Sequence, residues 1–286
     1  MIQTKTFSTR SSKPITLHHQ DCLEGLSSMQ DYSISLIVTS PPYNLGIKYE
    51  TYDDSISRED YLDWIEKWSV LVSKKLAENG SLFLNVGSAP RDPFIPMDIA
   101  SRVGHHFTLQ NVIHWIKAIS IDSQFSKSGL CDRAALNFGH YKPINSMRYV
   151  NDCHEYIFHF SHQGIVPLDR KAIGVPYTYK SNITRWKSVD GDLRCRGNTW
   201  FIPYKTITSR KKDRPHPATF PESLVKRCIL LHGLSRVKCV VDPFMGIGTT
   251  ALACIDLDVP CTGFEIDETY FSEAVKRVNA RLDSEP

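Results

Sequence analysis

Short apolar runs alternate along the chain with longer stretches in which apolar residues recur at helical spacing. The apolar runs, which predict buried strands, lie at residues 15–19, 34–38, 81–86, 108–116, 154–160, 237–241 and 261–264. The stretches of helical spacing, which predict amphipathic helices, lie at 61–72, 96–103, 221–232, 249–257 and 268–282. Strands that alternate with helices form βαβ units. We therefore expect an α/β fold built on one mostly parallel sheet.

Two features mark boundaries in this pattern. Asn79 and Gly80 predict the end of the helix that covers 61–72, because glycine and asparagine favour helix C-termini. Residues 44–60 predict a long polar and aromatic loop directly after the strand at 34–38, and long loops are commonly functional. The alternation then breaks down between residues 161 and 214, where no helical periodicity is evident.

Residues 161–214 also carry an uneven share of the charge. Twelve Lys and Arg residues against four Asp residues give this segment a local charge of +8, whereas the whole chain has a formal net charge of +3. Aromatic residues, among them Trp186 and Trp200, are interleaved with the basic ones. The combination is typical of a nucleic-acid surface, although a solvated loop region can carry the same charge pattern.

The composition narrows the class of protein. A chain of 286 residues with 41% hydrophobic and 23% charged residues fits a soluble globular protein with one large domain or one and a half. The 8 cysteines are scattered, which predicts the reduced thiols of a cytoplasmic protein. Residues 1–13 lack the apolar core of a signal peptide, and no run reaches the about 18 apolar residues of a membrane span.

The stretch Thr39-Ser40-Pro41-Pro42-Tyr43-Asn44 follows the strand predicted at 34–38. Proline has no backbone N–H and a fixed φ, so the two prolines end the strand and stiffen the loop. The loop presents the Ser40 hydroxyl and the Tyr43 ring at the carboxyl end of a strand, where open α/β sheets bind ligands. It suits a flat, polar substrate such as a nucleobase. Taken alone, it is equally consistent with a stiff turn around a core tyrosine.

A second loop, at 242–251, joins a predicted strand to a predicted helix. Its pattern Gly246-x-Gly248-x-x-Ala251 fits a nucleotide-binding loop, because glycines allow a tight turn and a close approach of the backbone to a ligand. Glu265 ends the next strand, where an acidic residue binds ribose hydroxyls. These residues predict a nucleotide-type cofactor, and on this feature alone NAD is a candidate.

Together these segments resemble the motifs of amino-group DNA methyltransferases. Residues 242–250 and 263–267 resemble their AdoMet-binding motifs, 39–43 resembles their catalytic motif, and 215–221 resembles the segment over the methionine part of AdoMet. Residues 154–158 are also similar to the family. The resemblance implies S-adenosyl-L-methionine (AdoMet) as cofactor, bound by Asp21, Phe220, Pro221, Asp242, Phe244, Gly246, Gly248, Thr249, Thr250 and Glu265.

The order of the motifs resembles the β arrangement, a circular permutation of the common Rossmann-like, AdoMet-dependent methyltransferase sheet. It implies that residues 1–160 form the catalytic half of the domain, 215–286 its AdoMet-binding half, and 161–214 a basic, irregular target-recognition region. Neighbouring strands would bring the two loops together although about 200 residues separate them. The expected DNA contacts are Arg170, Lys171, Lys180, Arg185, Arg194 and Arg196.

Ser40 bears on the target base. In the family, Asp-Pro-Pro-Tyr is typical of adenine-N6 enzymes and Ser-Pro-Pro-Tyr of cytosine-N4 enzymes. The resemblance therefore implies transfer of the AdoMet methyl group to cytosine N4 in double-stranded DNA, with adenine N6 as the alternative. It also implies a prokaryotic restriction-modification system, with a cognate endonuclease acting on the same site and no membrane partner.

The resemblance also suggests how the catalytic motif acts. The target base is flipped out of the duplex, because its amine cannot otherwise meet the cofactor. We expect Tyr43 to stack on the base. Ser40 Oγ and the Pro41 carbonyl then accept hydrogen bonds from the amine, while Pro42 stiffens the loop. The site contributes mainly position and electrostatics to an in-line methyl transfer.

Two other kinds of chemistry fit the sequence poorly. A cytosine-C5 methyltransferase requires a Pro-Cys nucleophile, and Pro260-Cys261 opens a strand with no loop to present it. The segment from Cys153 to His162 suggests metal ligands, but its His-Glu-x-x-x-His spacing is too long for a helical zinc pair. As a strand it places Cys153 and His154 on opposite faces, so we expect no metal site.

Two further alternatives remain open at this level. An RNA or protein amine methyltransferase would share the catalytic motif, and Trp186 and Trp200 would supply stacking surfaces for single-stranded RNA. A DNA-binding module without turnover would keep the fold and the charge, but it would have no need of an intact Ser40-Pro41-Pro42-Tyr43 sequence.

Overall fold

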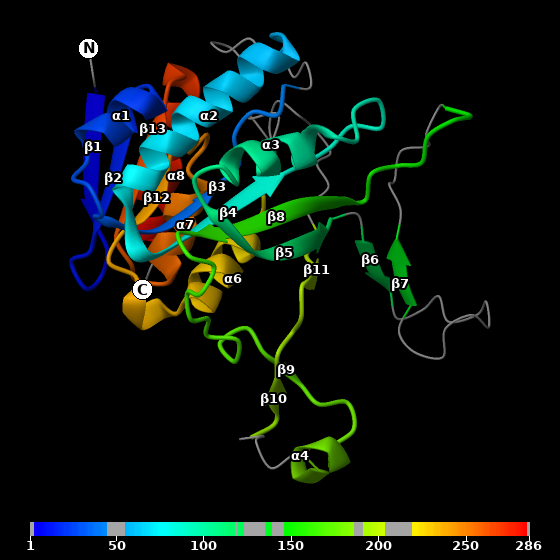
Figure 1. Ribbon diagram of the computed structural model, residues 1–286. Coiled ribbons are helices and arrows are strands. Elements are labelled where there is room, and N and C mark those ends of the chain that lie inside the picture. Colours follow the sequence, from blue (N-terminus) through cyan, green and yellow to red (C-terminus); the bar gives the residue numbers. More distant parts are fainter. Residues whose placement is uncertain are drawn as a thin grey trace.

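The computed structural model describes residues 3–44, 55–117, 119–122, 135–138, 146–185, 191–203 and 219–284, with 119–122 and 135–138 described by their backbone. Nine described strands form one central sheet (Figure 1). In spatial order they are β1 (Gln3–Ser8), β2 (Pro14–His19), β13 (Cys261–Glu265), β12 (Val240–Asp242), β3 (Ile34–Thr39), β4 (Leu76–Val86), β8 (His154–Ser161), β5 (Thr108–Ile116) and β11 (Thr199–Phe201).

Strand direction in this sheet is mostly uniform. Among the nine described strands, β1 pairs antiparallel with β2, and β8 pairs antiparallel with β4 and β5. The other pairings are parallel. The prediction of an α/β fold on a mostly parallel sheet is confirmed.

Helices cover both faces of the sheet. On one face lie α1 (Cys22–Ser28), α2 (Arg58–Lys75) and α3 (Ile95–Val103). On the other lie α6 (Glu222–His232), the short 3-10 helix η2 (Leu234–Arg236), α7 (Thr249–Asp256) and α8 (Glu268–Asp283). Among the described helices, none is both long and apolar enough to cross a lipid bilayer.

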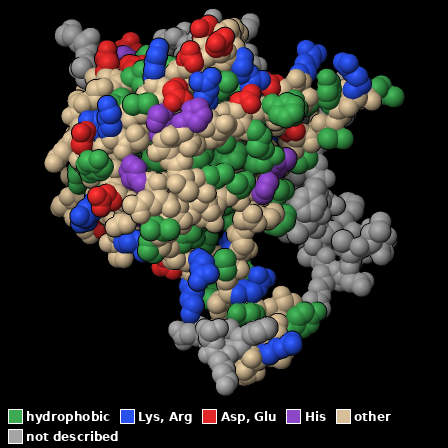
Figure 2. Space-filling model, viewed as in Figure 1, with side chains coloured by type: hydrophobic (Ala, Val, Ile, Leu, Met, Phe, Trp, Pro, Cys, Tyr) green, Lys and Arg blue, Asp and Glu red, His purple; other side chains and the backbone are tan. Residues whose placement is uncertain are grey.

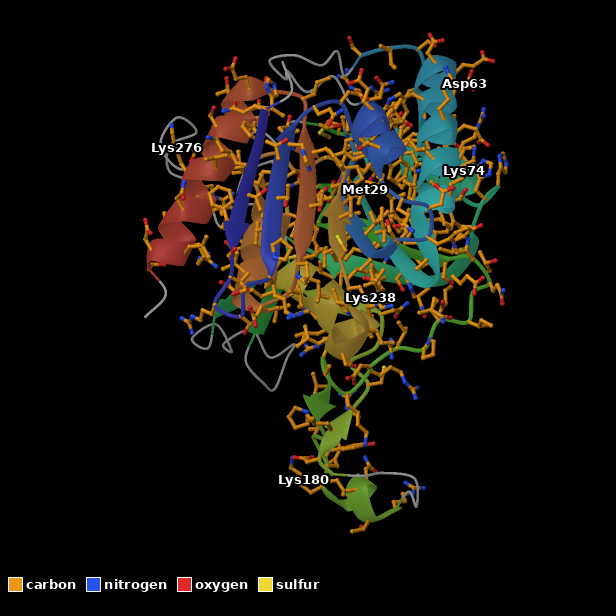
Figure 3. All side chains as sticks on the ribbon, turned by 90° about the vertical axis from the view of Figure 1, so that its left-hand side faces the viewer. Met29, Asp63, Lys74, Lys180, Lys238 and Lys276 are labelled. Carbon is orange, nitrogen blue, oxygen red and sulfur yellow. The ribbon has the colours of Figure 1, made fainter. Side chains whose placement is uncertain are left out.

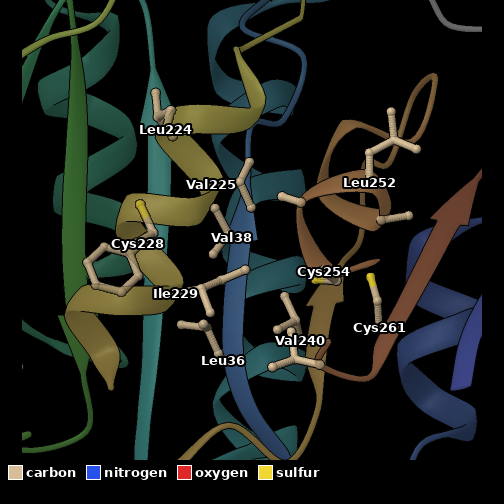
Figure 4. Packing of buried hydrophobic residues seen from close by; sticks show 14 of the residues in the cluster. Leu36, Val38, Leu224, Val225, Cys228, Ile229, Val240, Leu252, Cys254 and Cys261 are labelled. Atoms are coloured by element: carbon tan, nitrogen blue, oxygen red, sulfur yellow. The ribbon is translucent and has the colours of Figure 1, made fainter. Parts of the chain in front are cut away.

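Strand β3 lies at the centre of this arrangement, and all six of its residues are buried. Its side chains alternate between the two faces. Leu36 and Val38 belong to the core beneath α6 and α7, with Ile229 and Leu252 (Figure 4), whereas Ile37 belongs to the core beneath α2. A strand buried on both faces requires a continuous apolar run, which is what residues 34–38 provide.

The parallel pairing of β3 with β12 determines where the functional loops lie. Val240 pairs with Leu36 and Val241 with Ile37, so the two strands end side by side. The loop after β3 contains Ser40, and the loop after β12 contains Gly246. The prediction that neighbouring strands bring these distant loops together is confirmed.

The predicted end of α2 at Asn79-Gly80 is wrong. The helix ends at Lys75, and Leu76 is already extended, with φ −70° and ψ 131°. Leu76 is fully buried and pairs with Ile34, after which the strand register skips to Leu36 opposite Ser81. Asn79 and Gly80 therefore lie within β4, at the irregularity. Burial of Leu76 outweighs the local preference for a helix end.

Part of the segment 161–214 belongs to the main sheet. Strand β11 extends the sheet beside β5, and Trp200 is 1% exposed within the core. Its indole Nε1 donates to the Gly197 carbonyl at 3.1 Å. A ring so buried cannot stack on RNA, so that prediction is wrong for Trp200. Trp186 lies outside the described residues.

Residues 170–185 and 191–196, which we call the arm, project from the body, as Figures 1 and 3 show. The arm holds the short strands β9 (Val175–Pro176) and β10 (Leu193–Arg194), which pair antiparallel, and the helical turn α4 (Ser181–Arg185). A separate antiparallel pair, β6 (Ile119–Asp122) and β7 (Ala135–Phe138), lies at another edge of the body.

Two buried histidines, His159 of β8 and His232 of α6, meet at Ser81 of β4. His159 Nε2 lies 2.9 Å and His232 Nδ1 3.0 Å from the Ser81 hydroxyl. Burial lowers the pKa of His159 to about 3 and that of His232 to about 4. The folded state keeps both rings neutral, whereas the unfolded chain protonates them below about pH 6.5. As the pH falls, the unfolded chain gains a proton at each ring that the folded protein does not. Each ring therefore lowers the free energy of unfolding at low pH.

Replacing His159 with Gln is expected to reduce this pH dependence. Between pH 7.5 and pH 5.5, the wild-type protein should lose about 1.4 kcal/mol more unfolding free energy than the variant, because one protonation of the unfolded state is removed. Urea denaturation at the two pH values measures the difference. Gln163→Ala, at an exposed neutral side chain, is the control and should leave the dependence unchanged. Equal losses for wild type and His159→Gln would contradict the expectation.

Candidate active site

Asp242 joins the two functional loops at the carboxyl ends of β3 and β12. Its carboxylate accepts hydrogen bonds from the Thr39 hydroxyl at 2.6 Å, the Thr250 hydroxyl at 2.5 Å and the Phe244 N–H at 3.1 Å. The residue is 1% exposed. Burial raises the pKa of Asp242 to about 6, although the two hydroxyls and the N–H act in the opposite direction. One buried side chain thus fastens the residue before Ser40 to the first turn of α7.

The glycine loop has the backbone that its sequence requires. Gly246 has φ 53° and Gly248 φ 80°, in the left-handed region that side chains disfavour. Gly248 caps α7, and a Cβ added there would lie 3.1 Å from Ala274 Cβ on α8. The glycines therefore allow both the turn and the close approach of α8, while Thr249 and Thr250 begin α7 as buried residues.

Glu265 closes the loop from the end of β13. Its Oε2 accepts the Gly246 N–H at 2.7 Å and its Oε1 accepts the Asp267 N–H at 2.8 Å. Burial raises the pKa of Glu265 to about 7, against the lowering effect of these two hydrogen bonds. Each carboxylate oxygen keeps a second lone pair, so the ionised side chain can also accept hydroxyl groups of a ligand.

The other predicted cofactor residues surround this loop. His19 of β2 pairs with Glu265, so Asp21 lies near the same end of the sheet, where it caps α1 through the Leu23 N–H at 2.8 Å. Phe244 packs its ring on Trp64 and Trp68 of α2, with centroids 5.5 and 5.8 Å away. Pro221 caps α6, and Phe220 is half-buried before it. Residues 215–218 lie outside the described chain.

The proline loop after β3 is anchored at both ends. The Tyr61 hydroxyl of α2 donates to the Pro42 carbonyl at 2.6 Å, and the Asn44 side-chain amide donates to the Ile56 carbonyl at 2.8 Å. Within the loop, Ser40 Oγ and Tyr43 Oη form a hydrogen bond at 2.5 Å. The Tyr43 ring is 9% exposed, and Pro41 is buried. The predicted catalytic residues are thus held together in one rigid loop.

Three polar residues, on or directly after other strands, complete this end of the sheet. Asn85, at the end of β4, donates from Nδ2 to Tyr43 Oη at 2.8 Å and to Glu155 Oε2 at 2.7 Å. Glu155, at the start of the antiparallel β8, also accepts from Lys117 Nζ at 2.6 Å. Asn85 is 3% exposed, and the Glu155 side chain is 13% exposed. A carboxylate thus lies beside Tyr43, and an ammonium group pairs with the other carboxylate oxygen.

Sequence reasoning did not assign these three residues to the site. Asn85 is a polar residue that interrupts an apolar strand, which is a usable signal. Glu155 belongs to the segment 154–158 that resembles the family, but it was considered there as part of a metal motif. Lys117 carries no local signal, because its role depends on the pairing of β5 with β8.

The metal and Pro-Cys readings find no support in the described residues. His154 to Ser161 form a strand, and no group of three or more potential ligands meets anywhere in the described part of the chain. Cys261 is 2% exposed within β13. A hydrogen bond with Cys254 and burial both raise the pKa of the Cys261 thiol, so it stays protonated and unreactive.

The predicted DNA-contacting residues all lie on the arm. Figure 2 shows Lys and Arg side chains concentrated on this projection. The described part of the arm has six Lys and Arg residues and one acidic residue, Asp192, which pairs with Lys180. Arg196 differs from the others, because it is half-buried and its Nε donates to the Ile173 carbonyl at 2.8 Å. The six are Arg170, Lys171, Lys180, Arg185, Arg194 and Arg196.

A protein-family model described as DNA methylase matches residues 34–276. Type II methyltransferase M.ScaI from Streptomyces caespitosus is 28% identical over 284 residues, covering 94% of this chain and 83% of that protein. DNA adenine methyltransferase YhdJ from Escherichia coli K12 is 25% identical over 275 residues, covering 92% and 82%.

Solved structures share the fold. The cytosine-N4-specific PvuII DNA methyltransferase matches with a TM-score of 0.66 and 19% identity, covering 98% of this chain and 95% of that one. Other matched structures are complexes with S-adenosyl-L-methionine. The central sheet and the helices on its two faces therefore form the same Rossmann-like fold as these structures.

Proposed function

Because the chain belongs to the DNA methylase family, we propose that it transfers the methyl group of AdoMet to the exocyclic N4 amine of a cytosine in duplex DNA. One observation carries the proposal: Asp242 links Thr39, next to Ser40, with Thr250, next to the glycine loop. A cofactor held by that loop and Glu265 would present its methyl group to an amine held by the proline loop. The role of the protein would be to protect DNA within a restriction-modification system.

The choice of cytosine over adenine rests on Ser40. A serine hydroxyl accepts a hydrogen bond from either base, so the chemistry alone does not decide. The similar proteins include a cytosine-N4 enzyme and an adenine enzyme. We favour cytosine because Ser-Pro-Pro-Tyr resembles the cytosine-N4 motif, and adenine N6 is the alternative that the following experiment distinguishes.

Incubation with AdoMet and mixed-sequence duplex DNA, followed by digestion to nucleosides and mass analysis, tests this function. We expect N4-methylcytosine as the product. N6-methyladenine alone would reverse the base assignment, and no modified base would contradict a DNA substrate. Ser40→Ala should form product at least a hundredfold more slowly, because the amine loses a positioned acceptor in the transition state.

We propose that the basic residues of the arm bind the DNA. The six basic side chains would contact phosphates or base edges of a duplex lying across the proline loop. Base flipping would then bring the cytosine to Ser40 and Tyr43. Arg196, tied to the Ile173 carbonyl, would mainly support the arm.

Replacing Arg194 with Ala is expected to weaken DNA binding and its dependence on salt. If Arg194 contacts one phosphate, the slope of log K against log salt concentration should fall in magnitude by about 1. Fluorescence anisotropy with a labelled duplex at several salt concentrations measures the slope. Lys276→Ala, on α8 of the main body (Figure 3), is a matched loss of one charge and should leave it unchanged. An unchanged slope for Arg194→Ala would argue against this contact.

A further inference from the structure

The hydrogen bonds around Tyr43 run in one direction, which is set by Glu155. An ionised carboxylate only accepts hydrogen bonds, so Tyr43 Oη donates to Glu155 Oε2, at 3.4 Å. With its proton used there, Tyr43 Oη must accept from Ser40 Oγ at 2.5 Å. The Ser40 oxygen has only a long contact with Asn85 Nδ2, at 3.5 Å, and keeps a lone pair for the substrate. A serine hydroxyl can either donate or accept a hydrogen bond. Through Tyr43, Glu155 makes the Ser40 hydroxyl an acceptor toward the substrate.

Two neighbours fix the position and charge of Glu155. Lys117 Nζ donates to Oε1 at 2.6 Å, so this oxygen is held on the side away from Tyr43. Asn85 Nδ2 bridges Oε2 and Tyr43 Oη at 2.7 and 2.8 Å. Space is tight, because a Cβ added to Gly87 would lie 3.2 Å from Glu155 Cδ. The carboxylate is therefore locked at the end of the chain of hydroxyls.

We propose that Glu155 is the terminal acceptor of the proton that the target amine loses, through Ser40 and Tyr43; this inference rests on the proposed function. The nitrogen lone pair forms the N–C bond to the methyl group, while the C–S bond breaks and leaves its electron pair on sulfur. The cationic nitrogen gives its proton to Ser40 Oγ, the Ser40 proton passes to Tyr43 Oη, and the Tyr43 proton passes to Glu155. The products are a neutral methylated amine and a neutral carboxylic acid, which solvent later deprotonates.

The same arrangement explains how a serine motif can manage without its own carboxylate. Ser40 supplies the contact atom, and Glu155 supplies the negative charge from a different strand. The titratable and charged groups that face Glu155 from the described elements around it are Tyr43 and Lys117. His154, the preceding residue on β8, points to the opposite face of the strand.

The variant Glu155→Gln tests the inference under single-turnover conditions with saturating AdoMet. It keeps the shape but removes the proton acceptor, so the methyl-transfer rate constant should fall by about a hundredfold or more. Glu155→Asp keeps a carboxylate acceptor on the same strand, so it should recover most of the rate that Glu155→Gln loses. AdoMet and DNA affinities should change less than about threefold.

Controls separate the possible failures. Glu273→Gln makes the same chemical change on α8 and should match wild type throughout. If Glu155→Gln is as fast as wild type, or if Glu155→Asp is as slow as Glu155→Gln, the inference is wrong while the proposed function stands. Wild-type protein that modifies no DNA would overturn the proposed function and this inference with it. Should Glu155→Gln fail to fold, a loss of rate of about a hundredfold in a folded Glu155→Asp, which keeps the carboxylate, would overturn the inference.

Discussion

Replacing Asp242 with Ala is expected to lower the free energy of unfolding by about 3 kcal/mol or more and to reduce AdoMet binding severely. Three donors lose their acceptor in a site that water does not reach: the hydroxyls of Thr39 and Thr250 and the N–H of Phe244. Each buried donor left without a partner costs roughly 1–3 kcal/mol, and the hydroxyls can recover part of this by rotating. The glycine loop also loses its link to the proline loop.

The variant Asp242→Asn separates charge from hydrogen bonding. Its amide keeps the volume and one acceptor, and the Thr250 hydroxyl can turn to accept from the amide. Because burial already disfavours the ionised carboxylate, this variant should stay within about 1 kcal/mol of wild type in stability. Thermal and urea unfolding, together with calorimetric titration of AdoMet, measure both effects.

A matched control is available on the same helix. Asp256→Ala, at the end of α7, breaks partly exposed ion pairs with Lys226 and Arg281. Such pairs contribute about 1 kcal/mol or less each, so this variant should remain near wild type and should bind AdoMet normally. If Asp242→Ala were no less stable than Asp256→Ala, the linking role of Asp242 would be wrong.

An element of this structure can be predicted from the sequence when the interactions that determine it are local, and not when they join distant segments. The apolar run of β3, the helical spacing of α2 and the glycines before α7 are local patterns, and the structure has these elements where the patterns lie. The end of α2 could not be predicted in this way. The burial of Leu76 against Ile34 overrides the local signal at Asn79 and Gly80, and that pairing joins segments 42 residues apart.

The residues of the candidate site show the same difference between local and long-range interactions. Ser40, Tyr43 and Glu265 end strands with recognisable patterns, so sequence reasoning finds them. Glu155 and Asn85 matter because β4 and β8 pair antiparallel, which brings the end of one strand to the start of the other. Local spacing suggested a metal motif at His154-Glu155, whereas the strand pairing turns Glu155 toward Tyr43. Strand partners at this distance are not readable from one sequence.

Replacing Glu265 with Gln is expected to weaken AdoMet binding by about tenfold to a hundredfold at pH 8. The carboxylate would accept the ribose hydroxyls while its oxygens also hold the N–H groups of Gly246 and Asp267. Hydrogen bonds to a charged acceptor contribute about 1.5–3 kcal/mol each, and the neutral amide forfeits part of this. Its Nε2 also faces a backbone donor and cannot accept from it.

The pH dependence of this binding gives an independent test. The pKa of Glu265 in the free protein is raised to about 7. Below that pH the carboxyl group is protonated and accepts hydroxyl groups less well, so AdoMet affinity should fall as the pH is lowered through 7. Between pH 8 and pH 6 the wild-type dissociation constant should rise by up to about tenfold, with release of a proton on binding near pH 7.

Calorimetric titration in buffers of different ionisation enthalpy measures both the affinity and the proton release. Glu265→Gln should show a dissociation constant that changes little between pH 8 and pH 6, and no linked proton. Glu268→Gln, an exposed residue in the first turn of α8, should retain the wild-type affinity and pH dependence. If Glu265→Gln bound AdoMet as wild type does, with the same pH dependence, the ribose would have to be held elsewhere. Asp21, near the same end of the sheet, would then be the carboxylate to test.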